Sequence, residues 1–279
     1  MRSLDETRID KNWKAFLAYR DRRLQGVQTG IDAFDKYLLG LGGVTTIQGE
    51  TGCNKSTLAL QIVHFNLKLG HPCLMLDREN GDGRIRSRLM CQANNVSETE
   101  IKVCSIEQLK KYREPVKDLP LHVYTEATKD LELLKSRVEE ALQVYQKPLI
   151  LLVDSVQAMP PLDPDRAMNI EKWMNYFDQL KLDYEGKLTI LITSEINRAS
   201  YGLEGGLGAG KGSNAIEFKS ETLIDLRSGQ GPNDIKALIA KDRDGQKGAM
   251  FLVEKQFADP NNGASFTFKL DVSEGDIDV

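Results

Sequence analysis

The segment 44–69 constrains the fold of this chain more than any other, because it places a glycine-bearing loop between an apolar run and an amphipathic stretch. The loop reads GETGCNKS from Gly49 to Ser56. It fits the phosphate-loop pattern of Gly, four residues, Gly, Lys and then Ser or Thr, except that Asn54 stands at the second glycine of the pattern. Asparagine is the residue with a side chain that best tolerates a left-handed backbone, so we expect a cost of about 1 kcal/mol and an intact site.

The loop predicts a site for ATP and Mg²⁺. Its chemistry depends on backbone N–H groups turned toward phosphate oxygens, on a lysine for the β- and γ-phosphates, and on a hydroxyl for the metal. Lys55 and Ser56 supply the last two groups. The alternative is a tight strand-to-helix turn with an incidental lysine. The predicted nucleotide-binding residues are Gly49, Glu50, Thr51, Gly52, Cys53, Asn54, Lys55, Ser56 and Thr57.

Apolar runs alternate with helical patterns from residue 44 to residue 194, which is typical of an α/β fold. Strands are expected at 44–48, 72–77, 121–124, 148–154 and 188–194. Helices are expected at 55–69, 130–146 and 169–184, with a further arginine-containing helical region around 84–88. After the glycine-rich segment, closely spaced strands are expected near 221–227, 234–241, 248–254 and 265–270. The chain therefore predicts a mostly parallel twisted sheet with helices on both faces and an antiparallel C-terminal extension.

The expected domain organisation is simple. Residues 1–26 form an N-terminal linker in which 10–24 are amphipathic, residues 27–270 form one domain, and residues 271–279 form an acidic tail. In the linker, Trp13, Phe16 and Leu17 recur at roughly helical spacing, with basic residues on the other face. This helix either packs on its own domain or docks on a neighbouring subunit.

Composition narrows the partners and the compartment. The net charge of −4 argues against a protein that binds nucleic acid over its whole surface. Any contact with nucleic acid must therefore be confined to a few loops. No apolar run is long enough to cross a bilayer, and the N-terminus is too charged for a signal peptide. We expect a cytoplasmic protein without membrane contact. Its four cysteines and three histidines lack zinc-site spacing and predict reduced thiols.

Three acids follow predicted strands and are expected at the edge of the sheet that carries the loop. Asp154 ends the apolar run and is predicted to hold the Mg²⁺ shell; its alternative role is a helix N-cap. Glu79 is predicted to orient the attacking water, and Asp77 competes for that role by proximity. Glu195 either senses the γ-phosphate or caps its strand.

In order and spacing, these motifs resemble the RecA-like P-loop ATPases, and most closely the hexameric replicative helicases of the DnaB type. The segment GHPCLMLDRENGDGRIRSRL (70–89) resembles the family segment that ends in the catalytic glutamate, and Glu79 takes that position. LITSEINRA (191–199) resembles the Ser-Gln motif, with Glu195 in place of glutamine. GSNAIEFKSETLIDLR (212–227) and IAKDRDGQKGAMFL (239–252) resemble later family segments, the second of which is also found in the RadA branch.

The resemblance covers roughly residues 27–255 and implies further roles. Lys241 and Arg243 would reach the γ-phosphate bound by a neighbouring subunit, as an arginine finger does. Considered without the resemblance, these two residues would be solvated charges at a strand end. Loops at about 157–168 and 199–213 would face a central channel of a hexameric ring. The segment 198–213 holds six glycines and the predicted contacts to single-stranded DNA, which are Arg198, Tyr201 and Lys211. Its alternative is a surface loop without a ligand.

Three functions fit these patterns. The first is an ATP-driven, ring-forming DNA helicase that moves single-stranded DNA through its channel. The second is a RecA- or RadA-like recombination ATPase that forms filaments. The third is an ATP-sensing regulator in which Asn54 and Glu195 have slowed hydrolysis.

Overall fold

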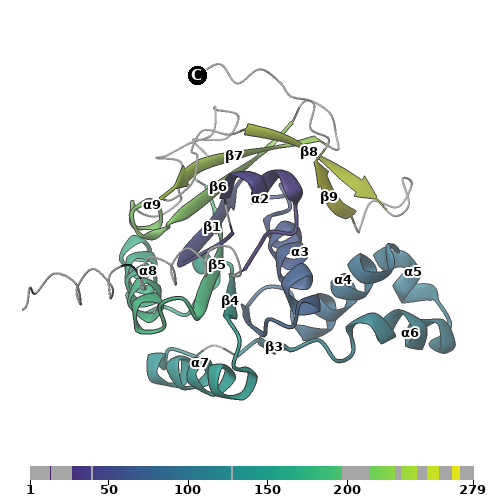
Figure 1. The fold of residues 1–279 in the computed structure, drawn as a ribbon, viewed down its shortest axis with the longest axis horizontal. Helices are drawn as coiled ribbons and strands as arrows, with labels where there is room; N and C mark the ends of the chain where they lie inside the picture. Colours follow the sequence, from purple (N-terminus) through teal and green to yellow (C-terminus); the bar gives the residue numbers. More distant parts are fainter. Residues whose placement is uncertain are drawn as a thin grey trace, which may run out of the picture.

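The computed structural model describes Trp13 and residues 27–38, 40–126, 128–196, 214–229, 234–243, 250–257 and 266–270 (Figure 1). Within these ranges the strands join one sheet in the order β3-β2-β4-β5-β1-β6-β7-β8-β9. Their bounds are β1 Val44–Gly49, β2 Cys73–Asp77, β3 Leu121–Tyr124, β4 Leu149–Asp154, β5 Leu188–Glu195, β6 Thr222–Ser228, β7 Asp234–Asp242, β8 Met250–Phe257 and β9 Phe266–Leu270. In the order of the sheet, neighbouring strands from β3 through β2, β4, β5 and β1 to β6 are parallel. The strands β7, β8 and β9 then pair antiparallel with their neighbours. The predicted mostly parallel sheet with an antiparallel extension is confirmed.

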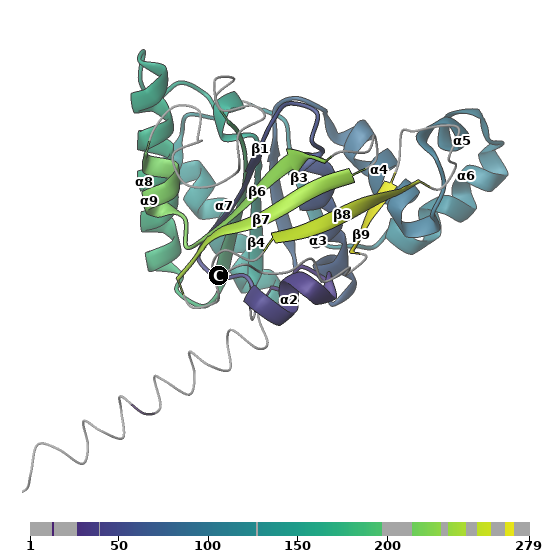
Figure 2. The same ribbon diagram turned by 90° about the horizontal axis from the view of Figure 1, so that it is seen from above.

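Helices cover both faces of this sheet, as predicted (Figures 1 and 2). Alternate side chains of β4 explain why. Ile150 and Leu152 join the core beneath α3, whereas Leu151 and Val153 join the core beneath α8, and all are buried. The helix bounds are α2 Asp32–Leu38, α3 Lys55–Lys68, α4 Asp82–Asn94, α5 Glu98–Val103, α6 Ile106–Arg113, α7 Leu131–Tyr145, α8 Arg166–Asp183 and α9 Ala215–Lys219, with 3₁₀ turns η1 Glu114–Val116 and η2 Val156–Ala158.

The short helices α2, α5, α6 and α9 were not predicted. In Figures 1 and 2, α5 and α6 lie beyond α4 at one end of the molecule. The α6 helix buries none of its side chains, so it lacks the apolar periodicity on which a sequence prediction depends. A start signal was present, because Ser97 and Ser105 accept hydrogen bonds from the backbone N–H groups of Glu100 and Gln108 as N-caps.

Register brings the carboxyl ends of the parallel strands to one edge of the sheet. Gly49 of β1 pairs with Glu195 of β5, and Asp77 of β2 pairs with Asp154 of β4. Groups that follow these strands in the chain therefore meet, although they come from positions far apart in the sequence.

Several predictions concern residues outside the described ranges. The amphipathic linker helix lies there except for Trp13, which is helical and 57% exposed. The acidic tail 271–279 also lies there, so the domain boundaries stay predictions. All four cysteines are free. None of the described helices combines the length and apolarity that a bilayer crossing requires.

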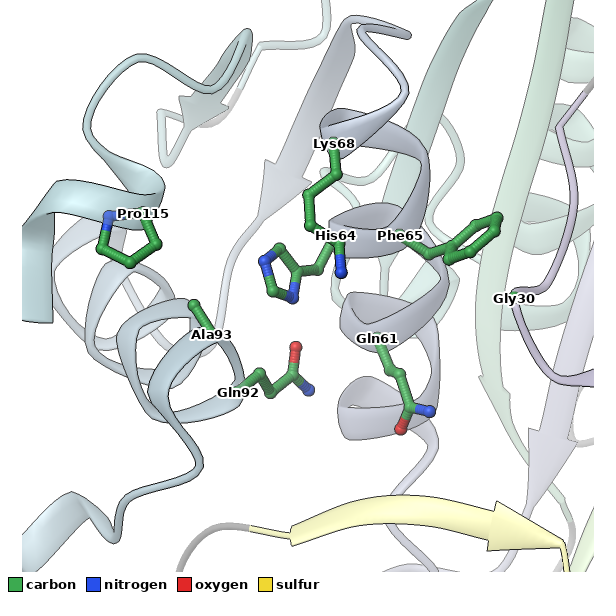
Figure 3. Close-up of a pocket in the computed structure, with 8 residues that line it drawn as sticks. All are labelled: Gly30, Gln61, His64, Phe65, Lys68, Gln92, Ala93 and Pro115. Atoms are coloured by element: carbon green, nitrogen blue, oxygen red, sulfur yellow. The ribbon is translucent and has the colours of Figure 1, made fainter.

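His64 gives the fold a pH dependence that can be measured. It lies on α3 beside a pocket of about 250 Å³ between α3, α4 and Gly30 (Figure 3). Its side chain is 7% exposed, and burial, helped by the charge of Lys68, lowers its pKa to about 4. The unfolded chain then binds the proton more tightly, so stability is fully present above pH 6.5 and falls as the pH drops from 6.5 to 4.

We expect this histidine to contribute about 1 to 3 kcal/mol to the loss of unfolding free energy over that range. Urea titrations at pH 7.0 and pH 4.5 measure the loss. The His64→Leu variant should lose less stability than the unchanged protein by this amount. Equal losses in the two proteins would contradict the assignment.

Candidate functional site

The loop after β1 has the backbone shape of a phosphate cradle. Gly49 packs so closely against β6 that an added Cβ would lie 2.3 Å from the carbonyl oxygen of Leu226. Gly52 has φ +86°, and Asn54 has φ 65° and ψ 33°, both in the left-handed region. The side chain of Asn54 donates to the carbonyl oxygen of Gly52 at 3.1 Å. The residue at the second pattern glycine therefore adopts the conformation that glycine would supply.

Lys55 opens α3 and turns back over the loop. Its Nζ donates to the carbonyl oxygens of Gly49 at 3.1 Å and of Glu50 at 2.8 Å. The ammonium group is thus held inside the loop by two neutral acceptors. A phosphate oxygen is a stronger, charged acceptor for the same group, so this arrangement fits a triphosphate.

Asp154 lies directly beside the first turn of α3. Its Oδ1 accepts from Ser56 Oγ at 2.9 Å and from Thr193 Oγ1 at 2.6 Å. Its Oδ2 is buried and has no hydrogen-bond partner among the described residues. Burial raises the pKa of Asp154, and the two hydroxyl groups oppose that rise. Asp154 does not cap the following 3₁₀ turn, where Ser155 is the N-cap residue.

These contacts fit a magnesium ion. Oxygen ligands from Ser, Asp and phosphate are those that Mg²⁺ accepts, and it often binds through its own water shell. A buried carboxylate with one oxygen unsatisfied is costly unless a cation or a water compensates it. Ser56 and Asp154 would hold the ion.

Two acids compete at the end of β2, and their surroundings differ. The carboxylate of Asp77 is fully buried and accepts from the backbone N–H groups of Asn80 and Gly81, at 2.9 and 2.6 Å, and from the Asn80 side chain. It stabilises the turn that leads to α4. Glu79 is exposed, and its Oε1 accepts from Ser155 Oγ at 3.0 Å. The geometry therefore favours Glu79 over Asp77 as the group that orients water.

Glu195 ends β5 and faces the loop. Its Oε1 accepts from Thr51 Oγ1 at 3.4 Å. The backbone of Glu195 is held by Gln157 of η2, since Glu195 N donates to Gln157 Oε1 at 3.2 Å and Gln157 Nε2 donates to Glu195 O at 3.4 Å. Glu195 is thus in contact with the loop, as a sensor of bound phosphate requires.

Lys241 and Arg243 lie at the opposite edge of the sheet. β7 runs antiparallel to β6, so its last residues pair with Thr222 and Leu223, at the start of β6 and far from the loop. Lys241 Nζ donates to the carbonyl oxygens of Glu217 and Phe218 on α9. Burial and the neighbouring guanidinium group lower its pKa.

Arg243 is half-exposed, and its Nη1 lies 3.9 Å from Glu221 Oε1. This pair of cations does not meet the phosphate loop of its own chain. The predicted DNA contacts Arg198, Tyr201 and Lys211 lie outside the described residues.

Sequence reasoning missed the residues that connect the predicted ones. Thr193 and Ser155 are small hydroxyl residues at strand ends, which carry no pattern of their own. Arg227 is almost fully buried, pairs with Asp225 at 2.8 Å, and lies 3.9 Å from Glu50 of the loop. A signal for this pair was present, because charged residues at 225 and 227 interrupt an otherwise apolar strand.

Asn54 offers a direct test of the loop. Replacing Asn54 with Gly should leave the unfolding free energy almost unchanged, since glycine adopts φ 65° without strain. Asn54→Val should lower it by about 1 to 3 kcal/mol, because a β-branched residue is strained in the left-handed region. Urea denaturation of both variants measures the difference. If the two variants are equally stable, the loop does not hold the backbone conformation described here.

The chain is similar to known proteins over most of its length. A family model described as the DnaB-like helicase C-terminal domain matches residues 26–259. Two curated relatives are DNA repair protein RadA from Mycolicibacterium smegmatis and from Mycobacterium tuberculosis, each 29% identical, over 140 and 146 residues. These matches span 49% and 51% of this chain but only 24% and 25% of the relatives, about a quarter of their length.

Solved structures share the fold. The ATPase domain of G40P aligns with a TM-score of 0.79 at 16% identity and covers 96% of this chain and 99% of that chain. A DnaB-like replicative helicase, whose structure was described with its interactions with primase, aligns with a TM-score of 0.74 at 17% identity. That match covers 91% of this chain and 65% of the other. At these identities, the alignments establish the RecA-like fold.

Proposed function

This chain belongs to the family of the DnaB-like helicase C-terminal domain, and we propose that it is an ATP-driven ring translocase acting on single-stranded DNA. Membership of this family implies ATPase and helicase activity.

On one side of the proposed site, the loop from Gly49 to Ser56 binds the triphosphate with backbone N–H groups and Lys55. Ser56 and Asp154 hold Mg²⁺, which when bound neutralises charge on the β- and γ-phosphates. Glu79 orients the attacking water and accepts its proton, with Ser155 fixing the carboxylate at 3.0 Å. Glu195, in contact with Thr51, detects whether the γ-phosphate is present.

The other side of the site comes from a neighbouring subunit. The observation that carries this part is the position of Lys241 and Arg243 at the edge of the sheet opposite the loop. Lys241 is partly buried beside Arg243, and among the described residues its Nζ donates to the backbone carbonyl groups of Glu217 and Phe218. The carboxylates of Glu217 and Glu221 are close enough to oppose the lowering of its pKa. The guanidinium of Arg243 is half-exposed, and its 3.9 Å separation from Glu221 is too long for a hydrogen bond. It can therefore bind an anion from outside the chain, and the γ-phosphate held by a neighbouring subunit is that anion.

Contact with DNA is confined to a few loops, which agrees with the net charge of −4. Segments 157–168 and 198–213 follow β4 and β5, whose carboxyl ends carry the nucleotide site. Each proposed DNA-binding segment therefore begins three residues after a strand end that carries part of the site. Glycine-rich loops with a few cations can follow a phosphate backbone without base recognition.

ATPase rates with and without a single-stranded oligonucleotide test the proposal, together with electron microscopy in a non-hydrolysable ATP analogue. We expect DNA-stimulated hydrolysis and closed rings. Open filaments would instead support a recombination ATPase, which the similarity to RadA over half of the chain favours as second candidate. ATP binding without turnover would point to a regulator, and a monomer that ignores ATP would refute all three.

A further inference from the structure

Gln157 occupies a position that the proposed reaction does not yet use. It lies in η2, three residues after Asp154, at the start of the segment 157–168. Its side-chain amide reaches across to β5, where Nε2 donates to Ser194 Oγ at 2.9 Å and to Glu195 O at 3.4 Å. In return, Glu195 N donates to Gln157 Oε1 at 3.2 Å. One amide group therefore satisfies both backbone polar groups of Glu195.

We call this set of hydrogen bonds from the Gln157 amide to Ser194 and Glu195 the clamp, and it joins the starts of two loops. Gln157 begins one segment that follows β4, and Glu195 stands three residues before the segment 198–213 that follows β5. Directly after Glu195, Ile196 is fully buried and its N–H donates to Gly49 O at 3.1 Å. The backbone after Glu195 is thus anchored to β1, and the Gln157 amide links it to the start of the segment that follows β4.

The same clamp reaches the nucleotide site through Glu195. The Glu195 side chain contacts Thr51 of the phosphate loop, and its backbone is the part that Gln157 holds. A shift of either loop would therefore change the position of the carboxylate relative to the γ-phosphate. A contiguous element of this kind, with contacts that both sites can bias, can carry coupling between two sites.

We propose that Gln157 is the positioning residue through which nucleic acid bound to the loops accelerates ATP hydrolysis. This inference rests on the proposed function, since it presupposes DNA-stimulated turnover. The side-chain hydrogen bonds of Gln157 given above go to Ser194 and Glu195 of β5, and none of these bonds involves the phosphate loop or Glu79. Its loss should remove the stimulation and leave the basal chemistry in place.

The test uses Gln157→Met, which keeps the length of the side chain but removes the Nε2 donor and the Oε1 acceptor. Gln157→Ala serves as a second variant. We expect basal ATPase within about threefold of the unchanged protein, and a fall of about five- to fifty-fold in the ratio of DNA-stimulated to basal rate. The KM for ATP and the affinity for a fluorescent poly-dT oligonucleotide should stay within about threefold. The matched control is Gln179→Ala, because Gln179 is an exposed glutamine on α8 that bonds Asp183 instead.

The outcomes separate this inference from the function on which it rests. Unchanged stimulation in a folded Gln157→Met protein would overturn the role of Gln157 and leave the helicase proposal standing. A parallel loss of basal rate would also overturn it, since Gln157 would then act within the basal machinery. If the unchanged protein shows no DNA stimulation, both proposals fail together.

Discussion

Replacing Glu79 with Gln is expected to lower kcat for ATP hydrolysis by about 10²- to 10⁴-fold while ATP binding persists. The amide has the shape of the carboxylate and can still accept the hydrogen bond from Ser155 Oγ, which spans 3.0 Å. What it loses is the ability to take a proton from water. The loop, Lys55 and Asp154 are untouched, so the site should fill with ATP and stall.

Steady-state ATPase assays and the binding of a fluorescent ATP analogue measure the two halves of this prediction. Glu107→Gln on α6 is the matched control, because it makes the same chemical change on an exposed glutamate away from the nucleotide site. Hydrolysis at the normal rate in Glu79→Gln would show that another group activates the water. Asp77 would then need reconsideration, although its carboxylate already accepts three hydrogen bonds from its own turn.

The second large effect concerns Arg243. If Arg243 acts as the proposed arginine finger, Arg243→Ala is expected to lower the DNA-stimulated kcat by about 10³-fold, with little change in ATP affinity. Lys55→Ala should also be inactive, but for a different reason, since it removes the ammonium group that is proposed to bind the phosphates. Each variant leaves intact the half of the site that the other lacks.

Mixing the two inactive variants therefore gives a sharp test. An interface with the loop of an Arg243→Ala subunit and the cations of a Lys55→Ala subunit is complete. With free subunit exchange, we expect up to about a quarter of the interfaces, and of the activity, to return. If Arg243 served its own chain, no combination would be complete and the mixture would stay inactive.

The control for mixing pairs Lys55→Ala with Arg113→Ala, in which an exposed arginine of α6 is removed instead. Arg113→Ala alone should be fully active. The ATPase activity of this mixture measures how strongly inactive subunits inhibit the active subunits in the same ring. The activity of the test mixture is compared with this value.

The local features of the site were predictable because they depend on neighbouring residues. The loop pattern, the left-handed backbone at Asn54 and the apolar run ending in Asp154 each need only a few consecutive residues. The alternation of strands and helices was predictable for the same reason. The short helices α5 and α6 were not, since they bury too little apolar surface to leave a periodic pattern.

The choice between neighbouring acids depended on contacts that the chain forms only when folded. Asp77 and Glu79 lie two residues apart, and the sequence left both open as the base. Burial of Asp77 in its turn and the exposure of Glu79 beside Ser155 separate them. Thr193 and Gln157 gain their significance from partners on other strands, at separations of 39 and 38 residues.

By itself, the sequence determined that this chain folds as an α/β sheet and that a phosphate loop follows its first strand. Propensity, periodicity and the glycine pattern are properties of short segments, so they can be read before any contact forms. Only the tertiary structure decided that Asp154 meets Ser56, that Gln157 holds Glu195, and that Arg243 lies at the far edge. Those facts follow from strand order, register and the direction of β7, which are set by packing of the whole sheet.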